Sequence, residues 1–224
     1  MGKVPVITID GPSGSGKGTL AQRVAETLGW HFLDSGAIYR VLGIITERAD
    51  ISVDCVDKIA ELAANMPLSF IRSRTLLGEE DVSDLIRTET AGNAASKVAA
   101  IPQVRHALLE WQRDYAKPPG LVADGRDMGT VVFPSAEVKI FLTASAEERA
   151  LRRYKQLKEK GLGVNLARLT EEIRERDERD SNRSAAPLTA ADQALQLDST
   201  AMAMDEVFQQ VMQKVFATLP NLRQ

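Results

Sequence analysis

The stretch VPVITIDGPSGSGKGTLAQRVAETLG, residues 4–29, decides the fold. It begins with an apolar run rich in β-branched residues, 4–9, which predicts a strand. After a glycine-rich turn, Leu20, Val24 and Leu28 recur every four residues and predict a helix. A strand, a glycine-rich turn and a helix in this order are typical of a loop that binds phosphate groups.

The turn itself reads GPSGSGKGT. Its glycines allow the backbone to turn successive N–H groups inward, and the following helix directs the positive end of its dipole at the same place. Lys17 adds a charge within reach of the β- and γ-phosphates, and Thr19 offers a hydroxyl to a magnesium ion. We therefore expect the whole turn to bind a nucleoside triphosphate: Gly11, Pro12, Ser13, Gly14, Ser15, Gly16, Lys17, Gly18 and Thr19.

The turn departs from the general phosphate-loop motif at one position. The motif ends in Gly-Lys followed by Ser or Thr, whereas here Gly18 follows the lysine and Thr19 comes one residue later. Gly-Lys-Gly-Thr is common among kinases that act on small molecules and nucleotides. The guanine-reading pattern Asn-Lys-x-Asp is absent from the sequence, which counts against a GTP-dependent switch.

Four further apolar runs predict strands at 31–34, 120–124, 138–144 and 194–199, with helical patterns between them. This alternation predicts an α/β fold, a five-stranded parallel sheet flanked by helices. Two stretches exceed an ordinary crossover. Residues 50–118 include a segment at about 66–84 that reads as a small antiparallel piece. Residues 148–187 are so charged that we expect no core of their own there, only a mobile flap of one or two helices.

Composition excludes several classes of protein. The 224 residues carry a formal net charge of −3, which argues against a domain that coats nucleic acid. Cys55 is the single cysteine, so no intramolecular disulfide is possible. Neither an apolar leader nor an apolar run of membrane-spanning length is present. We expect a cytoplasmic protein that binds neither nucleic acid nor membrane, and a monomer, because one core accounts for the apolar stripes.

Cationic residues recur in three later segments: DSGAIYR at 34–40, ADGRDMGTVVFP at 123–134 and RERDERDSNR at 174–183. Ser35 suits a turn or a helix cap. Arg126 and Asp127 follow the third predicted strand, at the edge where open parallel sheets bind ligands. Helical spacing places four charged residues of the last segment on one face: Arg176, Arg179, Asp180 and Arg183.

Each of these segments has an ordinary alternative interpretation. The first is also consistent with a merely capped helix, and the last with a solvated surface whose charges pair among themselves. Beside a phosphate loop they favour phosphoryl transfer, which needs cations around both the donor and the acceptor.

Five motifs, in order along the chain, resemble the bacterial cytidylate (CMP/dCMP) kinase family: GPSGSGKGT, DSGAIYR, NAASKVAAIPQVR, ADGRDMGTVVFP and RERDERDSNR…APL. The resemblance covers essentially the whole chain. It implies a core of residues 1–34, 119–147 and 188–224 that contains the ATP-binding loop. It also implies a nucleoside-monophosphate-binding region at 35–118 and a helical lid at 148–187.

The resemblance also implies roles for individual residues. The phosphate of CMP would be bound by Arg40, Arg126 and Arg183, with Ser35 as a supporting contact. The cytosine edge would be read by Ser96, Arg105 and Asp127. Arg176 and Asp180 would bind the sugar hydroxyls. Arg149 and Arg153, which open the lid helix, would touch the ATP side.

The implied activity is transfer of the γ-phosphoryl group of ATP to CMP or dCMP with Mg²⁺. Such a reaction needs no catalytic base, because the second pKa of a phosphate monoester is about 6 and the attacking oxygen is mostly ionised at neutral pH. It needs countercharge, for which the candidates are Lys17, Arg40, Arg126, Arg183 and a Mg²⁺ ion held by Thr19. Two alternatives stay open: a related kinase acting on UMP or AMP, and a non-catalytic ATP-binding switch.

Overall fold

A computed structural model describes residues 3–71, 74–159, 161 and 163–223 of the chain. They fold into two compact units. Unit 1 comprises residues 1–33 and 115–224, and unit 2 comprises residues 34–114. Within the described residues, no helix combines the length and the apolar character that crossing a membrane requires.

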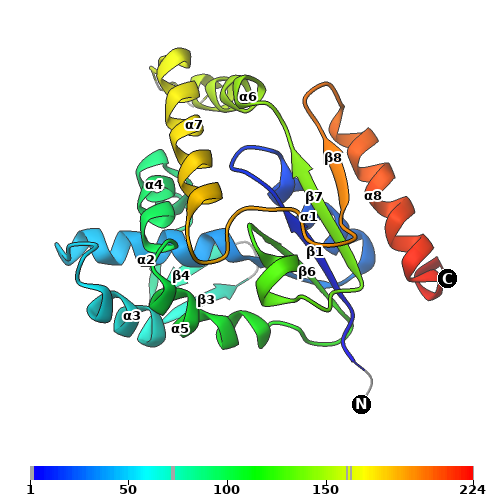
Figure 1. The fold of residues 1–224 in the computed structure, drawn as a ribbon, viewed down its shortest axis with the longest axis horizontal. Helices are drawn as coiled ribbons and strands as arrows, with labels where there is room; N and C mark the ends of the chain where they lie inside the picture. Colours follow the sequence, from blue (N-terminus) through cyan, green and yellow to red (C-terminus); the bar gives the residue numbers. More distant parts are fainter. Residues whose placement is uncertain (1–2, 72–73, 160, 162, 224) are drawn as a thin grey trace. The chain divides into compact units, whose positions relative to one another are not determined.

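The first predicted strand is β1, Val6–Asp10, and all its residues are buried. It occupies the centre of a five-stranded sheet with the order β2-β6-β1-β7-β8 (Figure 1). The other strands are β2 (His31–Asp34), β6 (Leu121–Gly125), β7 (Val138–Thr143) and β8 (Leu195–Asp198). β1 runs parallel to β6 and to β7, and β7 runs parallel to β8. The predicted α/β fold with a five-stranded parallel sheet is confirmed.

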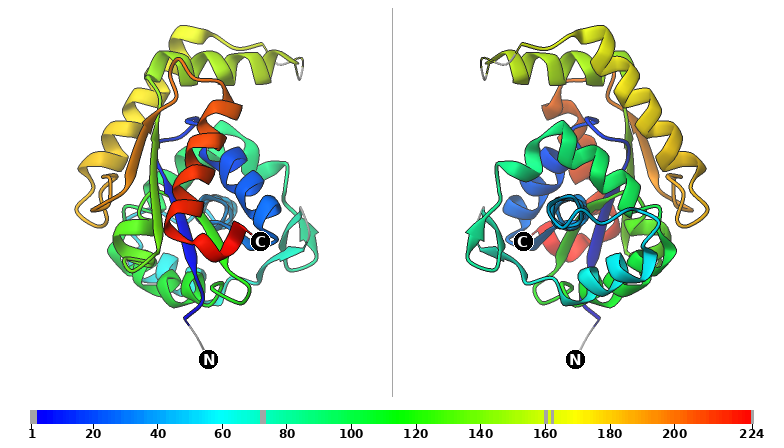
Figure 2. Two further views of the ribbon diagram at one scale, coloured as in Figure 1. Left: turned by 90° about the vertical axis from the view of Figure 1, so that its right-hand side faces the viewer. Right: turned by 90° about the vertical axis from the view of Figure 1, so that its left-hand side faces the viewer.

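Two helices of unit 1 pack on this sheet through apolar stripes. They are α1, Lys17–Leu28, and α8, Met204–Thr218. Leu20 and Val24 of α1 and Val207 of α8 are fully buried in one cluster with Ile7 and Ile9 of β1. Figure 2 shows α1 and α8 on one side of the strands and α7 on the other. The last described element is the short helix η3, Pro220–Arg223.

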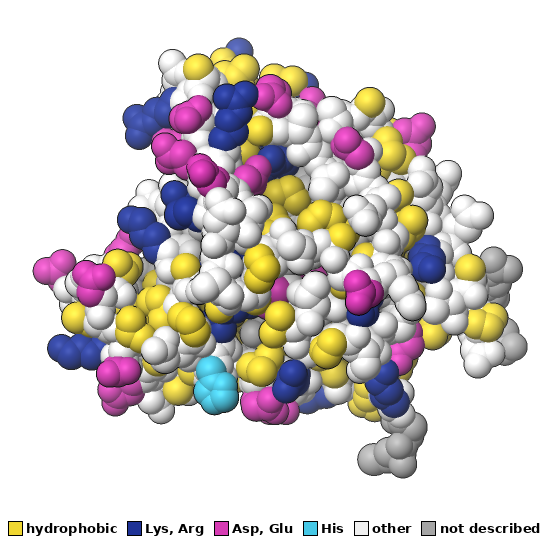
Figure 3. Space-filling view, in the orientation of Figure 1, with side chains coloured by type: hydrophobic (Ala, Val, Ile, Leu, Met, Phe, Trp, Pro, Cys, Tyr) yellow, Lys and Arg dark blue, Asp and Glu magenta, His cyan; other side chains and the backbone are white. Residues whose placement is uncertain are grey.

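Helices α6 (Ala146–Glu159) and α7 (Leu166–Asn182) form most of the charged segment. Charged side chains of both signs gather over them in Figure 3. The N–H of Glu148 donates to Ser145 Oγ at 3.2 Å, so the predicted cap of α6 is present. The expectation that this segment has no core of its own is wrong. Its few apolar side chains pack together between the two helices, and the buried ones are Ala150, Leu157, Leu169 and Ile173. Residues 160 and 162 lie outside the described residues.

Unit 2 is mostly helical, with α2 (Ser35–Arg48), α3 (Val56–Asn65), α4 (Glu89–Val98), α5 (Pro102–Arg113) and the short helix η1 (Leu85–Arg87). An antiparallel sheet lies between α3 and η1 in the chain and contains β3 (Leu68–Ile71), β4 (Arg74–Leu77) and β5 (Glu80–Asp81). Residues 72–73 of the expected antiparallel piece lie outside the described residues. α2 and α4 approach closely, since a Cβ added at Gly43 would lie 2.8 Å from Ala94 Cβ.

Candidate active site

The phosphate loop spans the gap between β1 and α1. Three of its glycines have positive φ: Gly11 (153°), Gly14 (79°) and Gly16 (93°). A Cβ added at Gly11 would lie 2.0 Å from the carbonyl oxygen of Leu142, so no side chain fits there. Gly16 is the N-cap of α1, and among the described residues no side chain caps this helix. The first N–H groups of α1 are therefore available to an anion.

Lys17 lies in the first turn of α1 and is largely buried, with 9% of its surface exposed. Its Nζ donates to the carbonyl oxygen of Pro12 at 3.4 Å and lies 3.7 Å from Oδ1 of Asp124 at the end of β6. A Cβ added at Gly18 would lie 3.0 Å from Oδ2 of the same Asp124. This crowding accounts for the glycine that follows the lysine. Thr19 is exposed on the first turn of α1.

Two arginines of α6 bind the carbonyl groups of the phosphate loop. Arg149 donates to the carbonyl oxygen of Ser13 at 3.0 Å and also pairs with Asp177 of α7. Arg152 donates to the carbonyl oxygens of Ser15, at 3.3 Å, and of Ser199, at 2.7 Å. Arg149 therefore lies against the loop, and its contact with ATP stays a prediction. The side chain of Arg153, the other residue predicted there, is partly exposed and donates to Gln156 at 3.5 Å.

The predicted acceptor residues of unit 1 come together at the end of β6 and the end of α7. Arg126 Nε lies 3.0 Å from Asp180 Oδ2, and Arg176 Nε lies 4.0 Å from the same oxygen. Arg183, the C-cap of α7, places Nη2 3.9 Å from Asp127 Oδ1. The side chains of this cluster are buried or nearly so. Charged groups are buried only when they are paired, and here the pairs place three guanidinium groups beside two carboxylates.

One residue of the expected helical face is exposed. Arg179 is exposed, whereas Arg176 and Asp180 are buried. The buried residues of α7, Leu169, Ile173, Arg176 and Asp180, follow alternating steps of four and three residues, and Arg179 lies one residue, about 100° around the helix, from Asp180 on this stripe.

Unit 2 contains the remaining predicted residues. Ser35 is the first residue of α2 and is buried, but it is not the cap. Asp34 is the cap, because its carboxylate accepts from the N–H of Ala37 at 3.0 Å. Asp and Ser are equally good caps, so the sequence could not choose between the two neighbours. Arg40 donates to the carbonyl oxygen of Ile86 in η1.

Ser96 and Arg105 lie on consecutive helices of unit 2. Ser96 is buried in α4. Arg105 of α5 donates to the carbonyl oxygen of Ala99 at 3.3 Å, and its guanidinium carbon lies 5.6 Å from the ring centroid of Tyr39. The role of Ser96, Arg105 and Asp127 as joint readers of a base stays a prediction.

The sequence was compared with known proteins. Residues 7–217 match a family model described as cytidylate kinase. The chain belongs to the cytidylate kinase family. A cytidylate kinase from Aeromonas hydrophila subsp. hydrophila is 62% identical over 207 residues, which cover 91% of this chain and 90% of that protein. One from Nitrosococcus oceani is 58% identical over 216 residues, with 94% and 95% covered.

The structure was compared in the same way. A gluconokinase from Sinorhizobium meliloti 1021 superposes with a TM-score of 0.50 at 16% identity, covering 99% of this chain and 97% of that one. At that identity the likeness concerns the fold alone. Membership of a kinase family implies ATP as the phosphate donor, and the uncapped start of α1 beside Lys17 suits its phosphates.

Three residues of this cytidylate kinase family member were missed by the sequence analysis. Asp10 ends β1 and accepts hydrogen bonds from the N–H groups of Met128 and Gly129, each at 2.8 Å. The pKa of Asp10 is raised to about 7, because burial and, to a lesser extent, the charges of Asp127 and Asp124 raise it by more than the two hydrogen bonds lower it. Asp10 and Asp124 share the signal that singled out Arg126, a place at the carboxyl end of a strand. Arg152 had no comparable signal, because its partners Ser15 and Ser199 are remote in sequence.

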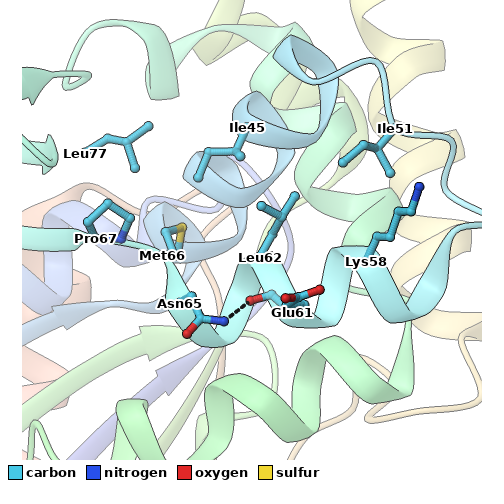
Figure 4. Close-up of a pocket in the computed structure, with 9 residues that line it drawn as sticks. All are labelled: Ile45, Ile51, Lys58, Glu61, Leu62, Asn65, Met66, Pro67 and Leu77. Carbon is cyan, nitrogen blue, oxygen red and sulfur yellow. Dashed lines mark hydrogen bonds between the residues drawn. The ribbon is translucent and has the colours of Figure 1, made fainter.

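Unit 2 also contains a cavity of about 690 Å³ with a mostly apolar lining (Figure 4). Its polar lining comes from Lys58, Glu61 and Asn65 of α3. Its apolar lining comes from Ile45, Ile51, Leu62, Met66, Pro67 and Leu77. None of the predicted nucleotide-binding residues lines it.

Proposed function

We propose that the protein transfers the γ-phosphoryl group of ATP to CMP or dCMP, giving ADP and CDP or dCDP. The observation that carries this proposal is the match of residues 7–217 to the cytidylate kinase model, with high identity to curated cytidylate kinases over nearly the whole chain. The paired arginines and carboxylates at the end of β6 support it, because they form a second polar cluster beside the phosphate loop.

The donor side is the phosphate loop. Its N–H groups and Lys17 would bind the triphosphate, and Asp124 holds Lys17 in place before the nucleotide arrives. Among the described residues no group of three His, Cys, Asp or Glu side chains is arranged to hold a metal ion. A Mg²⁺ ion would therefore rely on phosphate oxygens and water, with the Thr19 hydroxyl as protein ligand, which is the usual mode for this ion. When bound, it neutralises phosphate charge.

The acceptor side is built from arginines. An oxygen of the CMP phosphate, already ionised near neutral pH, attacks the γ-phosphorus while the bond to the ADP oxygen breaks. The work of the protein is to suppress repulsion between the two polyanions and to align them. We assign this to Lys17, Arg40, Arg126 and Arg183. The planar guanidinium can bind two phosphate oxygens at once, which favours arginine here.

The nucleoside would be read by polar and charged side chains. Asp127 would accept a hydrogen bond from the exocyclic amino group of cytosine, which uracil lacks, with Ser96 and Arg105 on the same edge. Arg176 and Asp180 would bind the sugar hydroxyls, and Ser35 would support the acceptor. Residues 35–118 would then be the monophosphate-binding region, and 148–187 a lid that closes over both nucleotides. Closure would keep water from the γ-phosphate.

A coupled assay of ADP release tests this proposal. The protein is given Mg·ATP with CMP, dCMP, UMP, AMP, dTMP or no acceptor. Turnover with CMP and dCMP far above the rest is expected. Preference for UMP or AMP would mean that the protein has the activity of a related kinase with a different acceptor. ADP release without any acceptor would contradict the roles given to Arg40, Arg126 and Arg183.

A further inference from the structure

We propose that Asp10 is a positioning residue that fixes the loop bearing Arg126 and Asp127, and so sets the affinity for the acceptor. This inference rests on the acceptor roles of Arg126 and Asp127 given above. Asp10 itself is not assigned to touch either substrate.

The need for such a residue comes from the short π-helical turn η2, Met128–Val132. A helix leaves its first N–H groups without partners inside the helix. Asp127 is the N-cap of η2, but its side chain makes no capping hydrogen bond. The N–H of Met128 donates to Oδ1 of Asp10 and that of Gly129 to Oδ2, each at 2.8 Å. The carboxylate of Asp10 in β1 therefore caps η2 in place of the Asp127 side chain.

The backbone of η2 packs tightly against the side chains of β1 around Asp10. Asp10 is 3% exposed, so water has little access to take over its hydrogen bonds. A Cβ added at Gly129 would lie 2.8 Å from Thr8 Oγ1 and 3.4 Å from Asp10 Oδ2. The backbone of η2 thus lies directly on the two polar side chains of β1.

The position of Asp10 in the chain gives this cap a wider effect. Asp10 immediately precedes Gly11 of the phosphate loop, and it pairs in register with Gly125, which immediately precedes Arg126. One carboxylate therefore stands at the start of the donor loop and at the start of the acceptor loop. Loss of its hydrogen bonds would free Arg126 and Asp127 to shift while β1 stays in the sheet.

The electrostatic surroundings of Asp10 make its cap depend on pH. The charged groups that face it are Asp124 at the end of β6 and Asp127 before η2, with Lys17 of α1 beside the first and Arg183 of α7 beside the second. Burial, with these two carboxylates, brings the pKa of Asp10 to about 7. Above that pH both oxygens accept an N–H, and below it one oxygen carries a proton and the cap weakens.

The test compares Asp10→Asn with Asp198→Asn. Asp198 also ends a strand of the sheet and accepts a backbone N–H, from Thr200 at 2.9 Å, but it is exposed. We expect Asp10→Asn to raise the KM for CMP by roughly ten- to a hundred-fold, the range for hydrogen bonds to charged groups, while the KM for ATP changes less than threefold. The rise in kcat/KM for CMP through pH 7 should disappear in Asp10→Asn, leaving the inflection of the CMP phosphate itself. Asp198→Asn should resemble the unmodified protein in its KM for CMP, its KM for ATP and the pH profile of kcat/KM for CMP.

Three results would overturn the inference: an unchanged KM for CMP, an equal rise in both KM values, or an unaltered pH profile. If Asp10→Asn does not fold, Gly129→Ala replaces it, since its Cβ would push η2 off Thr8, and it must show the same selective rise. The variant Asp127→Asn distinguishes a failure of the acceptor assignment from a failure of the role proposed for Asp10. If that variant has normal KM and specificity for CMP, the acceptor assignment fails; if it is impaired while Asp10→Asn is normal, only the role of Asp10 fails.

Discussion

Arg149 of α6 donates a hydrogen bond of 3.0 Å to the carbonyl oxygen of Ser13 in the phosphate loop. The same guanidinium donates to the carbonyl oxygen of Ala144 at 2.8 Å and pairs with Asp177 of α7. A single buried side chain therefore links the phosphate loop, the end of β7 and both helices of the charged segment.

Replacing Arg149 should consequently weaken ATP binding. In Arg149→Ala the carbonyl of Ser13 loses its partner and Asp177 loses its counterion, so the loop is no longer held in shape. We expect the KM for ATP to rise about tenfold, equivalent to about 1.4 kcal/mol, as measured by initial rates at saturating CMP. Arg168→Ala is the control, because Arg168 is 81% exposed on α7 and pairs with Glu172. A lower melting temperature with an unchanged KM for ATP would show that Arg149 serves stability alone.

Asp127→Asn should reduce the preference for CMP over UMP. The cytosine amino group donates where uracil offers a carbonyl, so a carboxylate favours cytosine. A hydrogen bond to a charged group is worth about 1.5–3 kcal/mol, or roughly ten- to a hundred-fold in the ratio of kcat/KM values. The KM for ATP should stay the same. Equal CMP/UMP ratios in the variant and the parent would mean that the base is read by other side chains.

The stability of the protein should depend on the protonation of Asp10. Its pKa is about 7 in the fold and 3.8 in the unfolded chain, so the folded state binds the proton more tightly. Folding stability contributed by this group is therefore full below about pH 4 and is lost as the pH rises to 7. Between pH 5 and pH 8 the parent should lose up to about 2.7 kcal/mol of unfolding free energy relative to Asp10→Asn, because about two pH units lie between pH 5 and the pKa and each is worth 1.36 kcal/mol; urea unfolding at the two pH values measures this. A constant difference between the two proteins would contradict the raised pKa.

Gly11→Ala should be far more destabilising than Gly29→Ala. Both glycines have positive φ, 153° and 65°. The new Cβ would lie 2.0 Å from the carbonyl oxygen of Leu142 in the first case and would meet no atom within 4 Å in the second. We expect losses in unfolding free energy of about 3 kcal/mol or more at Gly11 and about 1 kcal/mol at Gly29, from denaturant titrations. Similar losses would mean that the loop can move away from β7.

Hydrogen exchange tests the proposed lid. Amides of residues 148–187 should exchange more slowly with ATP and CMP together than with either alone, because closure needs ligand contacts on both sides. Amides of α8, which packs in the core of unit 1, serve as the internal reference. Unchanged exchange in the segment would remove the lid from the proposal.

The sequence alone predicted the helices and strands whose formation depends on residues close together in the chain. The β-branched run before Gly11 and the four-residue spacing of Leu20, Val24 and Leu28 predicted β1 and α1, and the same reasoning found the other strands. The features that were missed depend on contacts remote in sequence. Asp10 acquires its partners from Met128 and Gly129, and the core between α6 and α7 arises because a few apolar residues meet across two helices.

That small core has a thermodynamic consequence for any motion of the two helices. Ala150, Leu157, Leu169 and Ile173 pack α6 against α7, so we expect the two helices to move as one body when the proposed lid opens. The contacts that hold the pair to the rest of unit 1 include the bonds of Arg149 and Arg152 to loop carbonyls and the ion pair of Arg126 with Asp180, all of which are polar. Heat capacity reports chiefly on apolar surface. Opening of the proposed lid should therefore leave the heat capacity almost unchanged, and added salt, which screens the ion pair, should favour it.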